Sequence, residues 1–115
     1  MPLSYADLKA KAEKKAHEKG LPFIARDGKQ VFLRPLLSLS KVEGKNALAL
    51  VSIVENDKRD LNERLEAIDA MLVVASDRKR AMKDSLGDLD SESRMEIFQA
   101  WMEAAQGPEA SDSTS

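Results

Sequence analysis

Few residues in this 115-residue chain could do covalent or metal chemistry. It has no cysteine and one histidine, which excludes disulfides, thiolate metal sites and cysteine nucleophiles. His17 lies among lysines and glutamates with no carboxylate spaced to pair with it, so a solvated surface histidine is favoured over a catalytic or metal role. No Gly-x-Ser-x-Gly motif, phosphate loop or dinucleotide fingerprint occurs. The sequence therefore predicts a protein that is not an enzyme and holds no cofactor.

An acidic stretch near the C-terminus superficially resembles a calcium site. Asp84, Asp88 and Asp90 surround Gly87. A calcium loop, however, needs alternating ligands and a closing bidentate glutamate, and this stretch has neither. We interpret these residues as helix caps and expect no metal site.

Two basic clusters could contact phosphates, which keeps nucleic-acid binding open as an alternative. The clusters are Lys9, Lys11, Lys14, Lys15 and Lys19, and then Arg78, Lys79, Arg80 and Lys83. Acidic residues interrupt or flank both clusters, and the whole chain has a net charge of −2 and a pI near 5.5. Nucleic-acid-binding domains usually carry a basic excess, so the balance disfavours nucleic acid as the main partner.

Capping signals and hydrophobic periodicity predict a mainly α fold, a small helical domain with a short N-terminal β-hairpin. We expect an N-terminal helix within residues 1–20, a hairpin over 21–34 that turns at Asp27-Gly28, and a helical bundle over 40–106. Residues 1–106 would form one domain. Gly107-Pro108 predicts the end of the last helix, and 107–115, which lack large apolar groups, predict a disordered C-terminal tail.

The apolar residues of the two terminal helices are the candidate partner-binding site. The first helix carries only a thin stripe that includes Tyr5 and Leu8, which suits a peripheral arm. The last helix has Met95, Phe98, Trp101 and Met102, and methionine and aromatic residues are favoured at adaptable protein-binding surfaces. Ordinary core packing is the competing interpretation for each residue of the last helix.

Charge and hydropathy indicate the expected partners and cellular location of the protein. Residues 1–34 carry eight Lys/Arg and four Asp/Glu, whereas the chain from Asp84 onward carries eight acids and one base, Arg94. Such asymmetry permits head-to-tail association of copies, so a homo-oligomer is an open expectation. No apolar run approaches the ~20 residues that span a bilayer, and no signal-peptide pattern follows Met1. We therefore expect a cytoplasmic protein with no membrane partner.

The order of these features resembles the tail assembly chaperones of long-tailed, siphovirus-type phages that infect actinobacteria. Three segments carry the resemblance: the amphipathic start at 4–9, the segment at 23–36, and the ending at 98–111 with its aromatic-rich helix and small Gly/Glu/Ala/Ser tail. Members usually continue Gly-Glu after the last helix, and this chain departs from that pattern with Gly107-Pro108-Glu109.

The resemblance implies a non-enzymatic function in virion assembly. Such chaperones bind the tape measure protein before the tail tube polymerises, help recruit tail tube subunits, act in the host cell cytoplasm and are absent from the mature virion. A ribosomal frameshift often gives a second, extended form. Two alternatives remain, a small nucleic-acid-associated regulatory protein and another small phage structural or completion protein.

Overall fold

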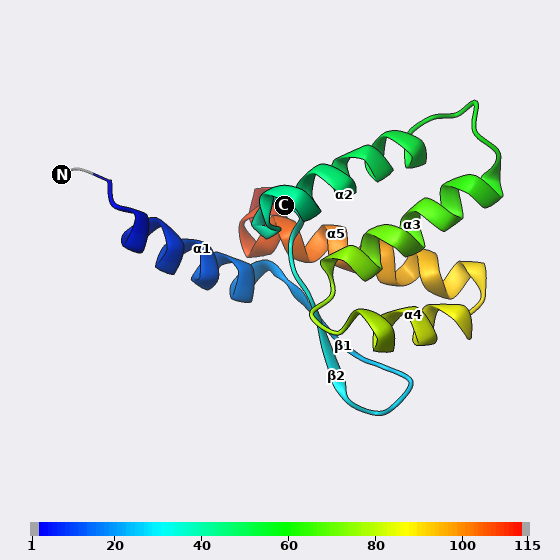
Figure 1. The fold of residues 1–115 in the computed structure, drawn as a ribbon, viewed down its shortest axis with the longest axis horizontal. Coiled ribbons are helices and arrows are strands. Elements are labelled where there is room, and N and C mark those ends of the chain that lie inside the picture. The colour runs from blue at the N-terminus through cyan, green and yellow to red at the C-terminus, as the bar shows by residue number, and fades with distance from the viewer. Residues whose placement is uncertain (1–2, 114–115) are drawn as a thin grey trace.

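The computed structural model describes the backbone of residues 3–113 and the side chains of residues 3–105. It is mostly helical with one antiparallel two-stranded hairpin near the N-terminus, which confirms the predicted fold class (Figure 1). The elements are α1 (Tyr5–Lys19), β1 (Leu21–Ile24), β2 (Gln30–Leu33), the 3₁₀ turn η1 (Leu36–Ser38), α2 (Lys41–Val54), α3 (Leu61–Ala75), α4 (Lys79–Gly87) and α5 (Ser91–Ser113).

Short polar side chains start four of the helices. Ser4, Ser40, Asp60 and Asp90 each accept a hydrogen bond from the backbone N–H three residues later, at donor–acceptor distances of 2.8 to 3.2 Å. Each bond satisfies one of the N–H groups that the first helical turn leaves without a partner. Capping signals in the sequence predict starts at Ser4, Ser40 and Asp90, and at Asp60 or Asn62 for the third helix, and the structure confirms them with Asp60 as the third cap.

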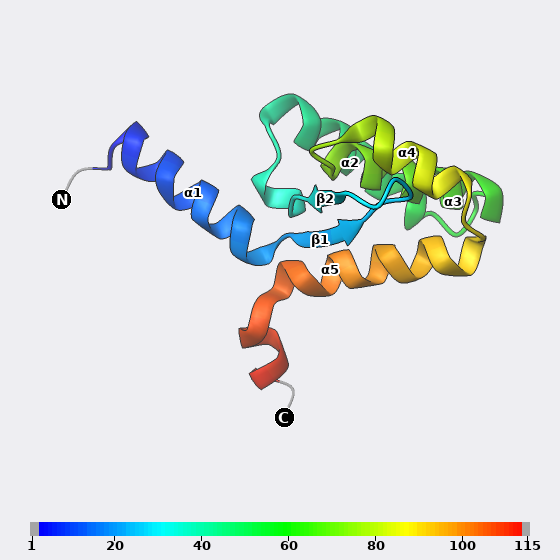
Figure 2. The same cartoon turned by 90° about the horizontal axis from the view of Figure 1, so that it is seen from below.

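The hairpin lies between two helical layers. Leu21 pairs with Leu33 and Phe23 with Val31, and the loop between the strands contains Gly28 at a φ of 81°. This positive φ is costly for any residue with a Cβ, so the Asp-Gly turn signal has a structural basis. Figure 2 shows the hairpin between α5 on one side and α2, α3 and α4 on the other.

The free edge of β2 is partly closed by the chain that follows α3. The Arg34 N–H donates to the Ala75 carbonyl at 2.9 Å, and the Asp77 N–H donates to the Phe32 carbonyl at 3.1 Å. The Phe32 N–H in turn donates to the Asp77 carboxylate at 2.9 Å. A two-stranded hairpin is marginal alone in water, and these bonds attach it to the helices.

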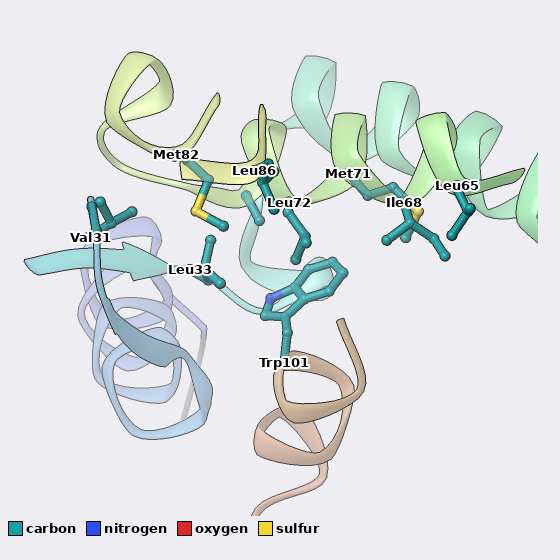
Figure 3. Close-up of a cluster of buried hydrophobic side chains, with 11 residues drawn as sticks. Val31, Leu33, Leu65, Ile68, Met71, Leu72, Met82, Leu86 and Trp101 are labelled. Atoms are coloured by element: carbon teal, nitrogen blue, oxygen red, sulfur yellow. The ribbon is translucent and has the colours of Figure 1, made fainter. Parts of the chain in front are cut away.

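Trp101 is part of the core, which corrects the expectation that it serves a partner. Its side chain is 1% exposed. Figure 3 shows the indole extending from α5 toward Leu33 and Leu72. The indole N–H donates to the Arg34 carbonyl at 2.8 Å. Trp101 therefore joins α5 to β2 and α3, and aromatic periodicity alone could not distinguish this role from a surface one.

Two further details differ from the sequence expectations. The backbone of α5 continues to Ser113, past Gly107-Pro108 where the sequence predicts a helix stop; residues 114–115 lie outside the described chain. The last part of α5, drawn in red in Figure 2, leaves the direction of the rest. A proline inside a helix removes a backbone hydrogen bond and bends the helix without always ending it. The helical spacing of Leu61 with Leu65 and Ile68 predicts that all three lie in the core, but Leu61 is 67% exposed at the start of α3.

Candidate functional site: an apolar pocket beside a projecting helix

Helix α1 projects from the body of the protein. It contains no buried residue, and only its C-terminal end approaches α5 and η1 (Figure 1). Tyr5 and Leu8, both predicted as partner-binding residues, lie on it with exposures of 78% and 49%. A 15-residue helix is marginally stable alone. Because none of the residues of α1 is buried, the arm gains little stability from packing on the rest of the described chain.

A close contact at Gly20 joins the arm to the hairpin. A Cβ built on Gly20 would overlap the Phe32 ring and would lie 2.8 Å from the Leu33 carbonyl oxygen. The φ of Gly20 is −83°, so the glycine is needed here for close approach and not for a left-handed backbone. One turn earlier, the His17 ring stacks on Phe32 with centroids 5.8 Å apart.

A pocket of about 500 Å³ opens where α1, η1 and α5 meet. We call it the arm pocket. Its lining is mainly apolar and comprises Ala12, Lys15, Lys19, Pro35, Leu36, Leu37, Ser38, Trp101, Met102 and Ala105. Leu37 is 95% exposed and Met102 42% exposed. Small-molecule and peptide sites are typically concave and apolar with a few polar groups, and the arm pocket has that composition.

The arm pocket continues along α1. Its three α1 residues, Ala12, Lys15 and Lys19, share a helical face with Tyr5 and Leu8, because positions 5, 8, 12, 15 and 19 alternate spacings of three and four. We call these five residues the arm stripe. An elongated partner could therefore contact the pocket and the exposed arm at the same time.

The other predicted site residues divide between core and surface. Phe98 is half-buried against Trp101, with ring centroids 5.9 Å apart and an interplanar angle of 52°. Met95 is half-buried, packs on the core and borders a polar hollow near the start of α5. Only Met102 of the four lies at the arm pocket with an exposed side chain. Met102 therefore lies near the arm stripe, whereas Met95 and Phe98 mainly pack against the core.

Sequence reasoning missed Leu36 and Leu37, which wall the arm pocket. It predicted the end of the second strand at Pro35 and a link over residues 38–40 and assigned no element to the two leucines, whereas residues 36–38 form a 3₁₀ turn. Leu36 packs against the core, and Leu37 points outward. Three leucines among the five residues 35–39 were a usable signal, because a short link gains nothing from several large apolar side chains unless something covers them.

A charged network next to the pocket is structural. Glu43 accepts from the Lys79 ammonium at 3.0 Å and from the Arg34 guanidinium at 3.2 and 3.3 Å. Hydrogen bonds from Lys79, and then from Arg34, lower the pKa of Glu43 to about 2. The Arg34 guanidinium also donates to the carbonyls of Val74 and Ala75 at the end of α3. Cations favour a helix C-terminus, so this network caps α3 and holds α2 near it.

The basic clusters do not form one phosphate-binding face. Arg78 pairs with Asp27 at 2.7 Å, which lowers the pKa of that carboxyl, and Lys79 pairs with Glu43. Figure 1 shows α1 and α4, the two helices that carry the clusters, on opposite sides of the hairpin. The separation and the ion pairs weaken the nucleic-acid alternative.

Among the described side chains, no three His, Cys, Asp or Glu residues gather closely enough to hold a metal ion. The side chain of Asp90 caps α5, and the carboxylate of Asp88 lies 3.8 Å from the Arg26 guanidinium, so both acids interact with protein groups nearby.

None of the helices within residues 3–113 combines the length and the apolar character that a membrane span requires. In comparisons with known proteins, no family model, curated protein or solved structure matches this chain.

Proposed function

We propose that this protein is a non-enzymatic phage tail assembly chaperone that holds an apolar helical segment of the tape measure protein in the arm pocket and along the arm stripe. In this role it acts in the host cytoplasm, delivers the tape measure protein to tail tube subunits and is absent from the mature virion. The observation that carries the proposal is the exposed apolar pocket walled by a helix that buries nothing of its own.

Exposed apolar residues at this site can bind a partner without unfolding the core. Leu37, Leu8 and Tyr5 are available in the folded monomer. Complete burial of a large apolar side chain contributes ~1.5–3 kcal/mol, so a few such contacts hold a partner with an affinity that still permits release. A chaperone that leaves the finished particle needs reversible contacts of this kind.

The resemblance to tail assembly chaperones gives the proposal its partner. Its three segments contribute to the site or to its immediate support: 4–9 holds Tyr5 and Leu8, 23–36 ends with Leu36, and 98–111 includes Met102. The segments that carry the resemblance therefore include exposed apolar residues of the site, which supports a binding function.

Co-purification tests the proposal. The full chain is co-expressed with the tagged tape measure protein encoded in the same phage genome, and retention is compared for wild type, Leu37→Asp and Leu61→Asp. Leu61 is a matched control because it is 67% exposed but does not line the arm pocket. We expect Leu37→Asp alone to abolish retention. Failure of the wild-type chain to bind any segment of the tape measure protein would refute the function.

A further inference from the structure

The positive charge at the arm pocket has no partner within the described chain. Lys15 and Lys19 line the pocket, yet neither takes part in an ion pair or hydrogen bond among the described residues. Among the side chains of residues 3–105, no carboxylate belongs to the pocket lining. In the second basic cluster, by contrast, Arg78 just before α4 and Lys79 at its start are paired with acids. An apolar hollow with two unpaired ammonium groups favours an occupant that is both apolar and anionic.

We propose that the arm pocket and arm stripe together receive an acidic amphipathic helix, whose carboxylates lie against Lys15 and Lys19. This inference rests on the proposed function and specifies the chemistry of the bound segment. The occupant has apolar residues at alternating spacings of three and four, matching the arm stripe, and Glu or Asp beside that apolar face.

The length of the apolar surface selects a helix over a lipid chain. At ~1.5 Å per residue the arm spans roughly 22 Å, and Tyr5 and Leu8 lie on the part that extends beyond the pocket. A fatty acyl chain seated in the pocket would leave both side chains in water. A helix laid along α1 covers them and also reaches Leu37 and Met102, by the helix-in-groove mode in which anchors repeat at i, i+3, i+4 and i+7.

A second copy of this chain is a poorer occupant. Its arm carries the same five lysines against three acids, Asp7, Glu13 and Glu18, so pairing of two arms would bring like charges together. Its acidic helix α5 packs Met95, Ile97 and Phe98 on its own core and has only Met102 as a large exposed apolar residue among its described side chains. Neither helix offers a free apolar face flanked by acids.

Two designed peptides test the inference with the full-length protein. Both have three heptads with Leu at a and d, and they differ only in carrying Glu or Lys at e and g, where like charges keep each peptide from pairing with itself. Fluorescence anisotropy of labelled peptide measures the affinity. We expect the Glu peptide to bind about tenfold more tightly than the Lys peptide at low salt, and the difference to vanish near ~1 M salt, where the Debye length is ~3 Å.

Adjacent lysines supply the matched variants. Lys15→Glu should weaken binding of the Glu peptide and strengthen binding of the Lys peptide, and Lys15→Glu combined with Lys19→Glu should reverse the preference. Lys14→Glu makes the same charge change one residue away, on the face of α1 that does not line the pocket, and should leave the preference in place. Circular dichroism confirms that all variants keep their helix content.

The outcomes separate the inference from the proposed function. Equal affinity for the two peptides, with both weakened by Leu37→Asp, would refute the acidic occupant while supporting a peptide-binding site. Binding of neither peptide would contradict both proposals. Saturable binding of dodecanoate that displaces the Glu peptide from the pocket, with no effect of Lys14→Glu or Lys15→Glu on peptide affinity, would assign the pocket to a lipid chain and overturn the inference.

Discussion

Truncation of Trp101 to alanine tests whether α5 is fixed by the core. The indole is 1% exposed, so it buries nearly all of its surface, roughly 200 Å². At ~25 cal/mol per Å² this burial contributes about 5 kcal/mol. Alanine keeps a small part of that contribution, but the mutation leaves a cavity and removes the hydrogen bond to the Arg34 carbonyl. We expect a loss of about 4 kcal/mol, a large share of the ~6–17 kcal/mol typical of a chain this long.

Urea denaturation followed by far-UV circular dichroism measures the loss without needing tryptophan fluorescence. With a slope of ~2 kcal/mol per molar urea, the midpoint for Trp101→Ala should fall by roughly 2 M. The adjacent Met102→Ala, at an exposed position, is the control and should change stability by less than ~1 kcal/mol. Equal midpoints for the two variants would refute the placement of Trp101 in the core and return it to the candidate binding surface.

Three further predictions concern contacts outside the pocket. Glu43, with a folded pKa of about 2 against an ordinary value of 4.5, stabilises the fold above pH 4.5, and that contribution is lost as the pH falls toward 2. After allowance for solvent screening, Glu43→Gln should cost ~1 kcal/mol at pH 7 and nothing measurable at pH 2, and a pH-independent cost in urea titrations would contradict this. Arg94→Met should destabilise the protein by ~1–3 kcal/mol at pH 7, because it leaves the largely buried Asp69 without its 2.6 Å partner. Burial already raises the pKa of Asp69, so that loss should shrink in melts at pH 5, where more of the carboxyl is protonated; a loss that grows at low pH would argue against the explanation. Gly20→Ala should cost ~1–3 kcal/mol by overlap with Phe32, and a double-mutant cycle with Phe32→Ala should show that the cost depends on the ring; additive effects would exclude the overlap.

Local signals in the sequence predicted the elements well. The caps at Ser4, Ser40, Asp60 and Asp90 depend on atoms three residues apart, and the turn at Gly28 depends on one backbone angle. Interactions of such short range depend only on the local sequence, so helix starts and the hairpin could be identified without tertiary information.

Residue exposure was harder to predict, because it depends on distant parts of the chain. Trp101 is buried through contacts that include a hydrogen bond to Arg34, 67 positions earlier. Leu61 belongs to the same periodic stripe as the buried Leu65, but it lies in the first turn of α3, where the α2–α3 pair extends beyond the hairpin (Figure 1). Helical periodicity predicts which residues share a face and cannot tell how far the opposing surface extends along it.

The surroundings of the candidate residues were hard to predict for the same reason. Tyr5, Leu8 and Met102 were predicted as partner-binding residues, with core packing open as the alternative for Met102, and the structure leaves all three exposed, on the arm or at its pocket. The wall formed by Leu36 and Leu37 was missed because it lies in a 3₁₀ turn, which has no long apolar repeat to detect.

The position of the hairpin affects how the chain folds while it is being synthesised. Its strands end at Leu33, whereas α5, which forms one of the two layers that enclose them, follows all the other described elements in the chain. During synthesis, α3 and α4 can therefore cover one side of the hairpin before α5 is available to cover the other. Closure of the hairpin joins segments far apart in the chain, the type of contact that slows folding. Until α5 packs, the uncovered apolar side of the hairpin favours aggregation of the partly folded chain.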